Sequence, residues 1–313
     1  MEFLQKIDNN SLALTESIEE LLEKFISAQD VNENSKETYK KALKQFFKYI
    51  QETNLTNLTR EDILTYKNSL RDRDCSAYTV TNYITAVRKF FDWTETERLF
   101  PNIAKNIKGA KQPKGFRKEA LTVDQVKTVL NNIDRQTLQG KRDFALLNLL
   151  VRTGLRTIEV VRADIEDIRQ EGGEALLYIQ GKGRETKDDI VLLTPDTLTP
   201  LREYLSARKG KEKEPLFTSL SDRNSGQRLT TRSISRIVKD FLRAVGLDSN
   251  KLSAHSFRHT AVTFSLLGGA TIQEAQTMAR HANINTTLIY AHNIDRVRKA
   301  PERKIEALLA GVN

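Results

Sequence analysis

The sequence predicts a mainly α fold with a small β-hairpin or sheet, divided into two domains. The chain has 313 residues, which is long enough for two separate cores. Apolar residues recur at helical spacing along most of it. Helix-breaking residues interrupt this spacing at Pro101, Gly109, Pro113 and Gly115. We therefore expect a helical domain over residues 1–104, a basic linker over 105–118 and a second domain over 119–313.

Four amphipathic segments between residues 15 and 100 predict a small helical bundle. The first, SIEELLEKFISAQ, carries glutamates in its first turn, and the second, SKETYKKALKQFFKYIQE, begins on the candidate N-cap Ser35. The third, TREDILTYKNSLRD, has Thr59 and Asp62 at the spacing of a capping box. The fourth is SAYTVTNYITAVRKFFDWT. The aromatic residues fall on the apolar stripes, so we interpret them as core residues rather than base-stacking platforms.

The second domain reads as buried helices around one β-hairpin. LTVDQVKTVLNNI has Thr122 or Asp124 as its start signal, and the apolar run after it is interrupted near Thr153 and Gly154. EALLYIQ and DDIVLLT favour β-structure and flank GKGRETK, which predicts a hairpin. From about residue 195 onward the pattern is helical again.

The net charge of +9 and the pI of about 9.4 favour a polyanionic partner, most often nucleic acid. The run KNIKGAKQPKGFRK holds six basic and no acidic residues. A solvated linker is the alternative interpretation of that run. No apolar stretch is long enough for a membrane span, and the first residues lack a signal-peptide pattern. The lone Cys75 excludes an internal disulfide and a cysteine zinc cluster, so we expect a cytoplasmic protein without metal.

All four histidines lie in the C-terminal part of the chain, two of them in SAHSFRHT. His255, Arg258 and His259 have helical i, i+3, i+4 spacing and share one face. Motifs for a P-loop, a zinc hydrolase and a serine hydrolase are absent from the sequence. Taken singly, each candidate residue also has a structural interpretation. Arg156, for example, could pair with Glu159 one turn later.

Taken in order, the motifs TGLRTIEV, GKGRETKDDIVL, HSFRHTAVT and ARHANINTTLIYAH resemble those of the tyrosine recombinase (phage integrase) family. The matching catalytic positions are Arg156, Lys182, His255, Arg258, His281 and Tyr290. The resemblance extends to the helical segment, which is similar to the family's core-binding (SAM-like) domain. It implies a compact Xer-type or mobile-element recombinase. One departure is Ala279-Arg280, where the family commonly has Leu-Gly, so that Arg280 is either a phosphate contact or a surface residue.

The resemblance implies a phosphate-binding shell that works without metal or cofactor. Arg156 and Arg258 would offer planar donor forks to a pentavalent phosphate. His281 would donate a hydrogen bond to it, and Glu159 would orient the shell. Two arginines would then do what a metal ion does in other enzymes of phosphate chemistry.

The resemblance also implies the proton transfers. Tyr290 would be the nucleophile, and since the pKa of free tyrosine is near 10, an acceptor is needed. We expect His255 to be that acceptor and Lys182 to protonate the leaving 5′-oxygen. The product would be a 3′-phosphotyrosine, which keeps the bond energy for rejoining without ATP. We interpret His259 as a packing or supporting residue and His292 as structural.

The expected partner is double-stranded DNA with paired inverted half-sites, bound by a homodimer on one site and a homotetramer in the synaptic complex. An accessory DNA-bending protein is a further candidate partner. Ile305, Leu308, Leu309 and Val312 form an apolar stripe, and we expect this tail to dock on a neighbouring protomer. Candidate DNA contacts are Lys105, Lys108, Lys111 and Lys114 in the linker, Thr79, Asn82 and Arg88 in the fourth segment, and Thr231, Arg232, Ser233 and Arg236 in LTTRSISRIV.

Several alternatives remain open at this point. A type IB topoisomerase uses the same residue set without exchanging partners, and a non-catalytic DNA-binding protein could keep the fold. A hairpin-forming protelomerase is usually much larger. Within recombination, we favour integration or excision of a mobile element over chromosome-dimer resolution, in a bacterial, nucleoid-associated setting.

Overall fold

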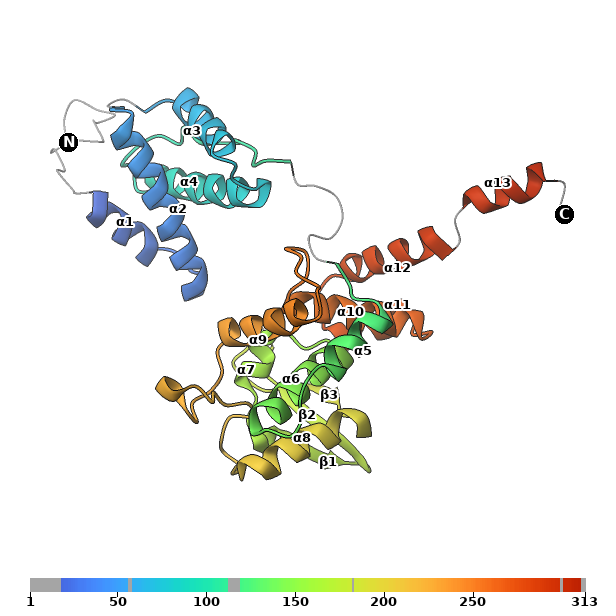
Figure 1. Cartoon of the computed structure of the whole chain (residues 1–313). Helices are drawn as coiled ribbons and strands as arrows, with labels where there is room; N and C mark the ends of the chain where they lie inside the picture. Colours follow the sequence, from blue (N-terminus) through green and yellow to red (C-terminus); the bar gives the residue numbers. More distant parts are fainter. Residues whose placement is uncertain (1–17, 56–57, 112–118, 182, 299–300, 311–313) are drawn as a thin grey trace. The chain divides into compact units, whose positions relative to one another are not determined.

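The computed structural model describes residues 18–55, 58–111, 119–181, 183–298 and 301–310. The chain divides into two compact units, Met1–Lys114 and Gly115–Asn313 (Figure 1). Helices dominate both units, and one small antiparallel sheet lies in the second. The predicted mainly α fold class is confirmed. In the described part of the chain, no helix is both long and apolar enough to cross a membrane.

Among its described residues, the first unit is a bundle of four helices with an aromatic core. Phe46 is fully buried and makes an edge contact with Tyr66, with ring centroids 5.0 Å apart. Thr59 and Asp62 form the predicted capping box. The predicted start of the second helix at Ser35 is wrong, because Asn32 caps the helix and accepts from the Ser35 amide at 3.0 Å. The helices are α1 (Ile18–Ser27), α2 (Glu33–Glu52), α3 (Arg60–Asp72) and α4 (Ala77–Thr96).

The first residues of the predicted linker, 105–110, pack against the bundle. Ile107 is buried in the bundle core. The Lys67 ammonium donates to the carbonyl of Lys108 at 2.7 Å, and the Thr81 hydroxyl donates to that of Ala110 at 3.2 Å. The basic side chains of this stretch are exposed while its backbone is fixed.

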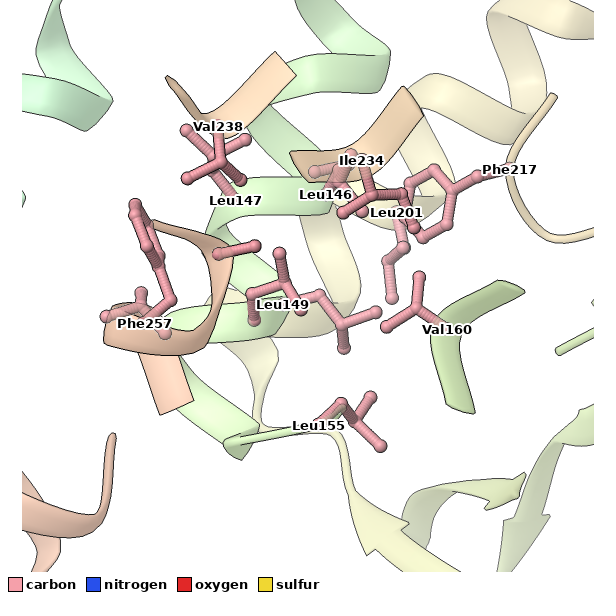
Figure 2. Packing of buried hydrophobic residues seen from close by; sticks show 14 of the residues in the cluster. Leu146, Leu147, Leu149, Leu155, Val160, Leu201, Phe217, Ile234, Val238 and Phe257 are labelled. Atoms are coloured by element: carbon pink, nitrogen blue, oxygen red, sulfur yellow. The ribbon is translucent and has the colours of Figure 1, made fainter. Parts of the chain in front are cut away.

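The second unit is built around α6, which is buried along most of its length. Figure 2 shows Leu146, Leu147 and Leu149 of α6 in one apolar cluster with Phe257 of α10 and Val238 of α9. The capping box of Thr122 with Gln125 starts the first helix of this unit, as one of the two predicted alternatives. The helices are α5 (Val123–Asn131), α6 (Leu138–Thr153), α7 (Thr157–Arg162), α8 (Pro195–Arg208), α9 (Thr231–Ala244), α10 (Ala254–Leu267), α11 (Ile272–Ala279), α12 (Ile284–Arg298) and α13 (Pro301–Leu309), with short 3-10 turns at Ile165–Asp167 and Asp222–Asn224.

The sheet has three antiparallel strands in the order β1-β2-β3: β1 (Ile168–Glu171), β2 (Glu174–Ile179) and β3 (Asp189–Leu192). The predicted hairpin corresponds to β2 and β3. The strand β1 was not predicted, because IRQE lacks an alternating apolar pattern. Its signal in the sequence is the pair Gly172-Gly173, which takes positive φ angles and turns the chain from β1 into β2. Lys182, between β2 and β3, lies outside the described residues.

Candidate active site

The site begins at the turn between α6 and α7. Gly154 ends α6 with a φ of 63°, a left-handed conformation that glycine adopts without steric cost. Arg156 follows as the N-cap of α7, and its backbone amide donates to the Glu159 carboxylate at 2.7 Å. The Arg156 guanidinium donates to the same carboxylate at 2.6 Å. This turn therefore sets the positions of one arginine and one carboxylate, in the ion pair expected from their spacing.

Glu159 is fully buried and is shared by two arginines. Its second partner is Arg280, whose Nη2 lies 3.0 Å from Oε2. Burial by itself raises the pKa of the Glu159 carboxyl, but Arg280 and Arg156 outweigh it, and the pKa lies below its ordinary value. Glu159 is therefore an anion in the folded protein.

Arg258 comes from α10 and is almost completely buried, with an exposed fraction of 3%. Its Nη1 donates to the carbonyl of Gly154 at 2.6 Å, and its Nη2 donates to the carbonyl of Ala279. Burial, with the like charges of Arg156 and Arg280, lowers the pKa of Arg258 to about 10. The guanidinium remains charged at neutral pH.

Arg280 is neither an exposed surface residue nor a side chain left free for a ligand. Only 9% of its side chain is exposed. Its Nη1 donates to the carbonyl of Met278 at 2.7 Å, in addition to the Nη2 contact with Glu159. Its own carbonyl accepts from Nη2 of Arg156 at 3.0 Å. The sequence singled out this position, but not its link to Glu159.

Tyr290 of α12 is buried beside two histidines. Its hydroxyl lies 2.6 Å from Nδ1 of His259, and its ring stacks on that of His281 with centroids 6.2 Å apart. His281 in turn bonds Thr287 through Nδ1 at 2.9 Å. The contact with His259 was not predicted, since His255 was the expected acceptor. The i, i+4 spacing of the two histidines was the available signal.

The titration of these groups follows from burial. Burial raises the pKa of the Tyr290 phenol to about 12. Burial, with the positive charge of Arg258, lowers the pKa of His281 to about 4. Burial likewise lowers the pKa of His259 to about 4, with His255 as a further contributor. At neutral pH the phenol is protonated and both histidines are neutral, so each histidine has one ring nitrogen able to accept.

A cavity of about 310 Å³ opens onto the arginines. Arg156, Arg258 and His255 line it, together with Ser235 of α9. His255 is exposed, and its ring makes an edge contact with that of His259, with centroids 4.6 Å apart. The two histidines of SAHSFRHT thus connect the cavity to the buried phenol. His292, interpreted as structural, has an exposed side chain.

The candidate DNA contacts fall on exposed or half-buried positions. Arg232, Ser233 and Arg236 line a hollow of about 1150 Å³ beside the loop of residues 219–230, and Thr231 is exposed at the start of α9. In the first unit, Arg88, Lys105, Lys108 and Lys111 are exposed and Thr79 and Asn82 are half-buried, whereas Lys114 lies outside the described residues.

Comparison with known proteins gives a consistent set of relatives. Residues 119–296 match the phage integrase family, and residues 18–98 match the N-terminal SAM-like domain of phage integrases. Tyrosine recombinase XerD from Listeria monocytogenes is 29% identical over 286 residues, which cover 89% of this chain and 94% of that protein. Tyrosine recombinase XerC from Chlamydia caviae is 30% identical over 77% of this chain and 76% of that protein.

Solved structures share the fold. The XerH site-specific recombinase, bound to its palindromic difH substrate in a post-cleavage complex, has a TM-score of 0.71 and 24% identity, covering 92% of this chain and 84% of that one. A lambda integrase fragment, crystallised as a dimer on a COC′ core site, has a TM-score of 0.69 and 15% identity over 86% of this chain and 96% of that one.

Proposed function

Because this chain belongs to the phage integrase family of tyrosine recombinases, we propose that it cleaves and rejoins DNA through a 3′-phosphotyrosine formed by Tyr290. The observation that carries the proposal is the convergence of Arg156, Arg258, His281 and Tyr290 from four separate segments on one site. Such a convergence of cationic donors with a phenol suits attack on a phosphodiester.

The two arginines bind the scissile phosphate from the cavity. Arg156 and Arg258 line it, and both are held by backbone carbonyls in fixed orientations. Donors that are already oriented need no reorganisation when negative charge develops on the pentavalent phosphate. His281 adds a ring nitrogen near Tyr290, and Glu159 holds Arg156.

The proton of Tyr290 leaves through His259. The phenol oxygen lies 2.6 Å from Nδ1 of that histidine, which is neutral at pH 7 and able to accept. His255 then serves as the exposed end of the path at the cavity. A phosphate anion in the cavity offsets the positive charges that lower the histidine pKa values, so it makes His259 a stronger base when substrate is present.

The transesterification balances without a cofactor. The Tyr290 oxygen forms a bond to phosphorus, the bond from phosphorus to the 5′-oxygen breaks, and the phenol proton passes to His259. The leaving 5′-oxygen takes a proton from Lys182, a residue assigned from the family motif and outside the described part of the chain. A 5′-hydroxyl from another strand then forms a bond to phosphorus while the bond from phosphorus to the Tyr290 oxygen breaks. The hydroxyl proton passes to Lys182, and Tyr290 takes its proton back from His259.

Double-stranded DNA with inverted half-sites is the proposed substrate, bound by a dimer and exchanged within a tetramer. Support comes from relatives: the XerH and lambda integrase structures were solved on DNA, the latter as a dimer. In this chain, Ile305, Leu308 and Leu309 of α13 are more than half exposed, as expected for an apolar helix that docks on a second copy. Integration or excision of a mobile element is the proposed role, ahead of dimer resolution.

Covalent trapping on nicked duplexes tests the proposal. The duplexes carry candidate sites from DNA that flanks the gene, and the products are separated on a denaturing gel. We expect wild type to form a DNA-linked band and Tyr290→Phe to form none, while both bind the duplex. The matched control is Tyr178→Phe, which removes a tyrosine hydroxyl that donates to Glu171 away from the site. We expect this variant to keep the DNA-linked band.

Two outcomes would overturn the proposal or narrow it. A band of equal strength from Tyr290→Phe would remove Tyr290 as the nucleophile. Relaxation of supercoiled plasmid with no exchange between two sites would favour a type IB topoisomerase activity instead.

A further inference from the structure

The last turn of α11 contacts all three charged residues of the phosphate-binding shell. The carbonyl of Ala279 accepts from Arg258, and the carbonyl of Arg280 accepts from Arg156. The side chain of Arg280 completes the set by pairing with Glu159 at 3.0 Å. Two adjacent residues therefore contact both arginines and the carboxylate that pairs with Arg156.

Arg280 adopts a backbone conformation that favours glycine. Its φ of 53° and ψ of 49° lie in the left-handed region, where a side chain costs conformational free energy. Glycine would occupy this position without that cost. The arginine side chain is nevertheless buried and engaged by Met278, Glu159 and Gly154. Its contacts outweigh the backbone cost, which suggests a role for the side chain itself.

We propose that Arg280 is a positioning residue that pairs with the buried Glu159 and thereby holds Arg156 in its orientation for the phosphate. It acts through Glu159, since Arg156 and Arg258 line the cavity whereas Arg280 does not and is paired with Glu159 instead. The Arg156 side chain is 30% exposed, so solvent screens its attraction to Glu159. The Arg280 side chain is only 9% exposed, and its attraction to the buried carboxylate is screened less. This inference rests on the proposed DNA cleavage and deepens it.

Arg280→Gly removes the side chain and its contact with Glu159 without adding backbone strain, because glycine adopts the left-handed conformation freely. A loss of activity in this variant is therefore due to the lost contact. Lys209→Gly is the matched control, because Lys209 is an exposed cation at the C-cap of α8 with a φ of 57°. We expect Arg280→Gly to slow single-turnover cleavage on the order of 10- to 100-fold, with DNA affinity within about threefold of wild type. Lys209→Gly keeps the wild-type rate.

The pH profile identifies the route through Glu159. Without Arg280 the buried carboxylate loses a countercharge, so its pKa rises and the acid limb of the cleavage profile moves to higher pH. In a Glu159→Gln background the carboxylate is absent. Adding Arg280→Gly there should not shift the acid limb of the pH profile further and should lower the cleavage rate little further. A loss that is equal at all pH values and additive with Glu159→Gln would overturn the proposal in favour of direct phosphate binding. An unchanged rate and profile would overturn it outright.

Stability without DNA gives a readout independent of cleavage. In wild type the pKa of Glu159 lies below its ordinary value of 4.5, so its ionisation adds stability as pH rises through that value. In Arg280→Gly this contribution is smaller. The free energy of unfolding therefore falls further below that of wild type as pH rises from 4 to 7. This growing difference disappears in the Glu159→Gln background. A loss of unfolding free energy that is independent of pH would contradict the proposed role of Arg280. This test does not depend on whether Tyr290 is the nucleophile.

Discussion

The interiors of the two units differ in what they bury. Within the described residues, the fully buried polar groups of the helical bundle are uncharged: Thr94 bonds to the carbonyls of Phe91 and Phe100, and Tyr66 buries its phenol. The second unit buries Glu159, Arg258 and His259 beside its apolar core. The bundle is therefore stabilised mainly by apolar packing. The second unit carries buried charges that stability alone does not require.

The charged residues buried in the second unit, and absent from the buried set among the described residues of the bundle, indicate an interior that serves more than apolar packing. A buried ion pair gains little over a well-packed apolar pair, so charges are kept inside a protein at a cost. In the second unit these charges surround Tyr290 and the cavity of Arg156 and Arg258. Substitutions in the bundle are thus expected to change stability, and substitutions in the site to change chemistry.

The largest expected effect is on the bundle core. Phe46→Ala removes a fully buried ring that contacts Phe47, Tyr66 and Phe91, and should lower the free energy of unfolding by about 4 kcal/mol. Trp93, the chain's single tryptophan, lies in α4 against Phe25 and Phe90. Its fluorescence during urea unfolding therefore reports on this unit.

The control for this substitution is Tyr78→Ala on the same unit. The Tyr78 side chain is 55% exposed, so its removal should change stability by no more than about 0.5 kcal/mol. Equal losses for the two variants would refute a bundle held together by its aromatic core.

The second prediction concerns chemistry without unfolding. Arg258→Lys retains a positive charge, but an ammonium cannot reproduce the planar fork that bonds Gly154 and Ala279. We expect cleavage to fall by about 100- to 1000-fold, measured in single-turnover trapping on nicked duplex. Hydrogen exchange of the α6 amides, which reports on the second unit, should stay at the wild-type level. A variant that cleaves at the wild-type rate would show that charge alone suffices.

The third prediction uses pH to separate the units. All histidines lie in the second unit, and the pKa of His259 falls from 6.5 to about 4 on burial. The unfolded state therefore binds more protons between these values, and stability is lost as pH falls from 6.5 to 4. His259→Gln does not titrate and should remove about 2 kcal/mol of that loss.

Hydrogen exchange of the α10 amides at pH 4.5 and 6.5 measures this effect. The Trp93 transition of the bundle serves as the internal control and should respond equally to pH in both proteins. The same pH dependence of α10 in wild type and His259→Gln would mean that His259 is not buried in its neutral form.

Much of the fold followed from the sequence, and several residues of the predicted site lie together in the structure, for physical reasons. Amphipathic spacing and the Thr59 and Thr122 caps are local signals, and they predicted the helices correctly. The pairing of Arg156 with Glu159 is also local, at three residues apart. By contrast, the contacts of Arg280 with Glu159 and of His259 with Tyr290 join segments 121 and 31 residues apart, so periodicity gives no information about them.

Three guanidinium groups lie near one carboxylate in this site, and only Arg156 and Arg280 pair with it, which leaves positive charge uncompensated among the described residues. Like charges at close range repel, so the protein without substrate carries a free-energy penalty inside its second unit. Any oxyanion that enters the cavity relieves the penalty and shifts the unfolding equilibrium by mass action. The thermal midpoint of this unit should therefore rise with the concentration of orthovanadate or of substrate DNA. Substrate binding and folding become linked equilibria at this one cluster.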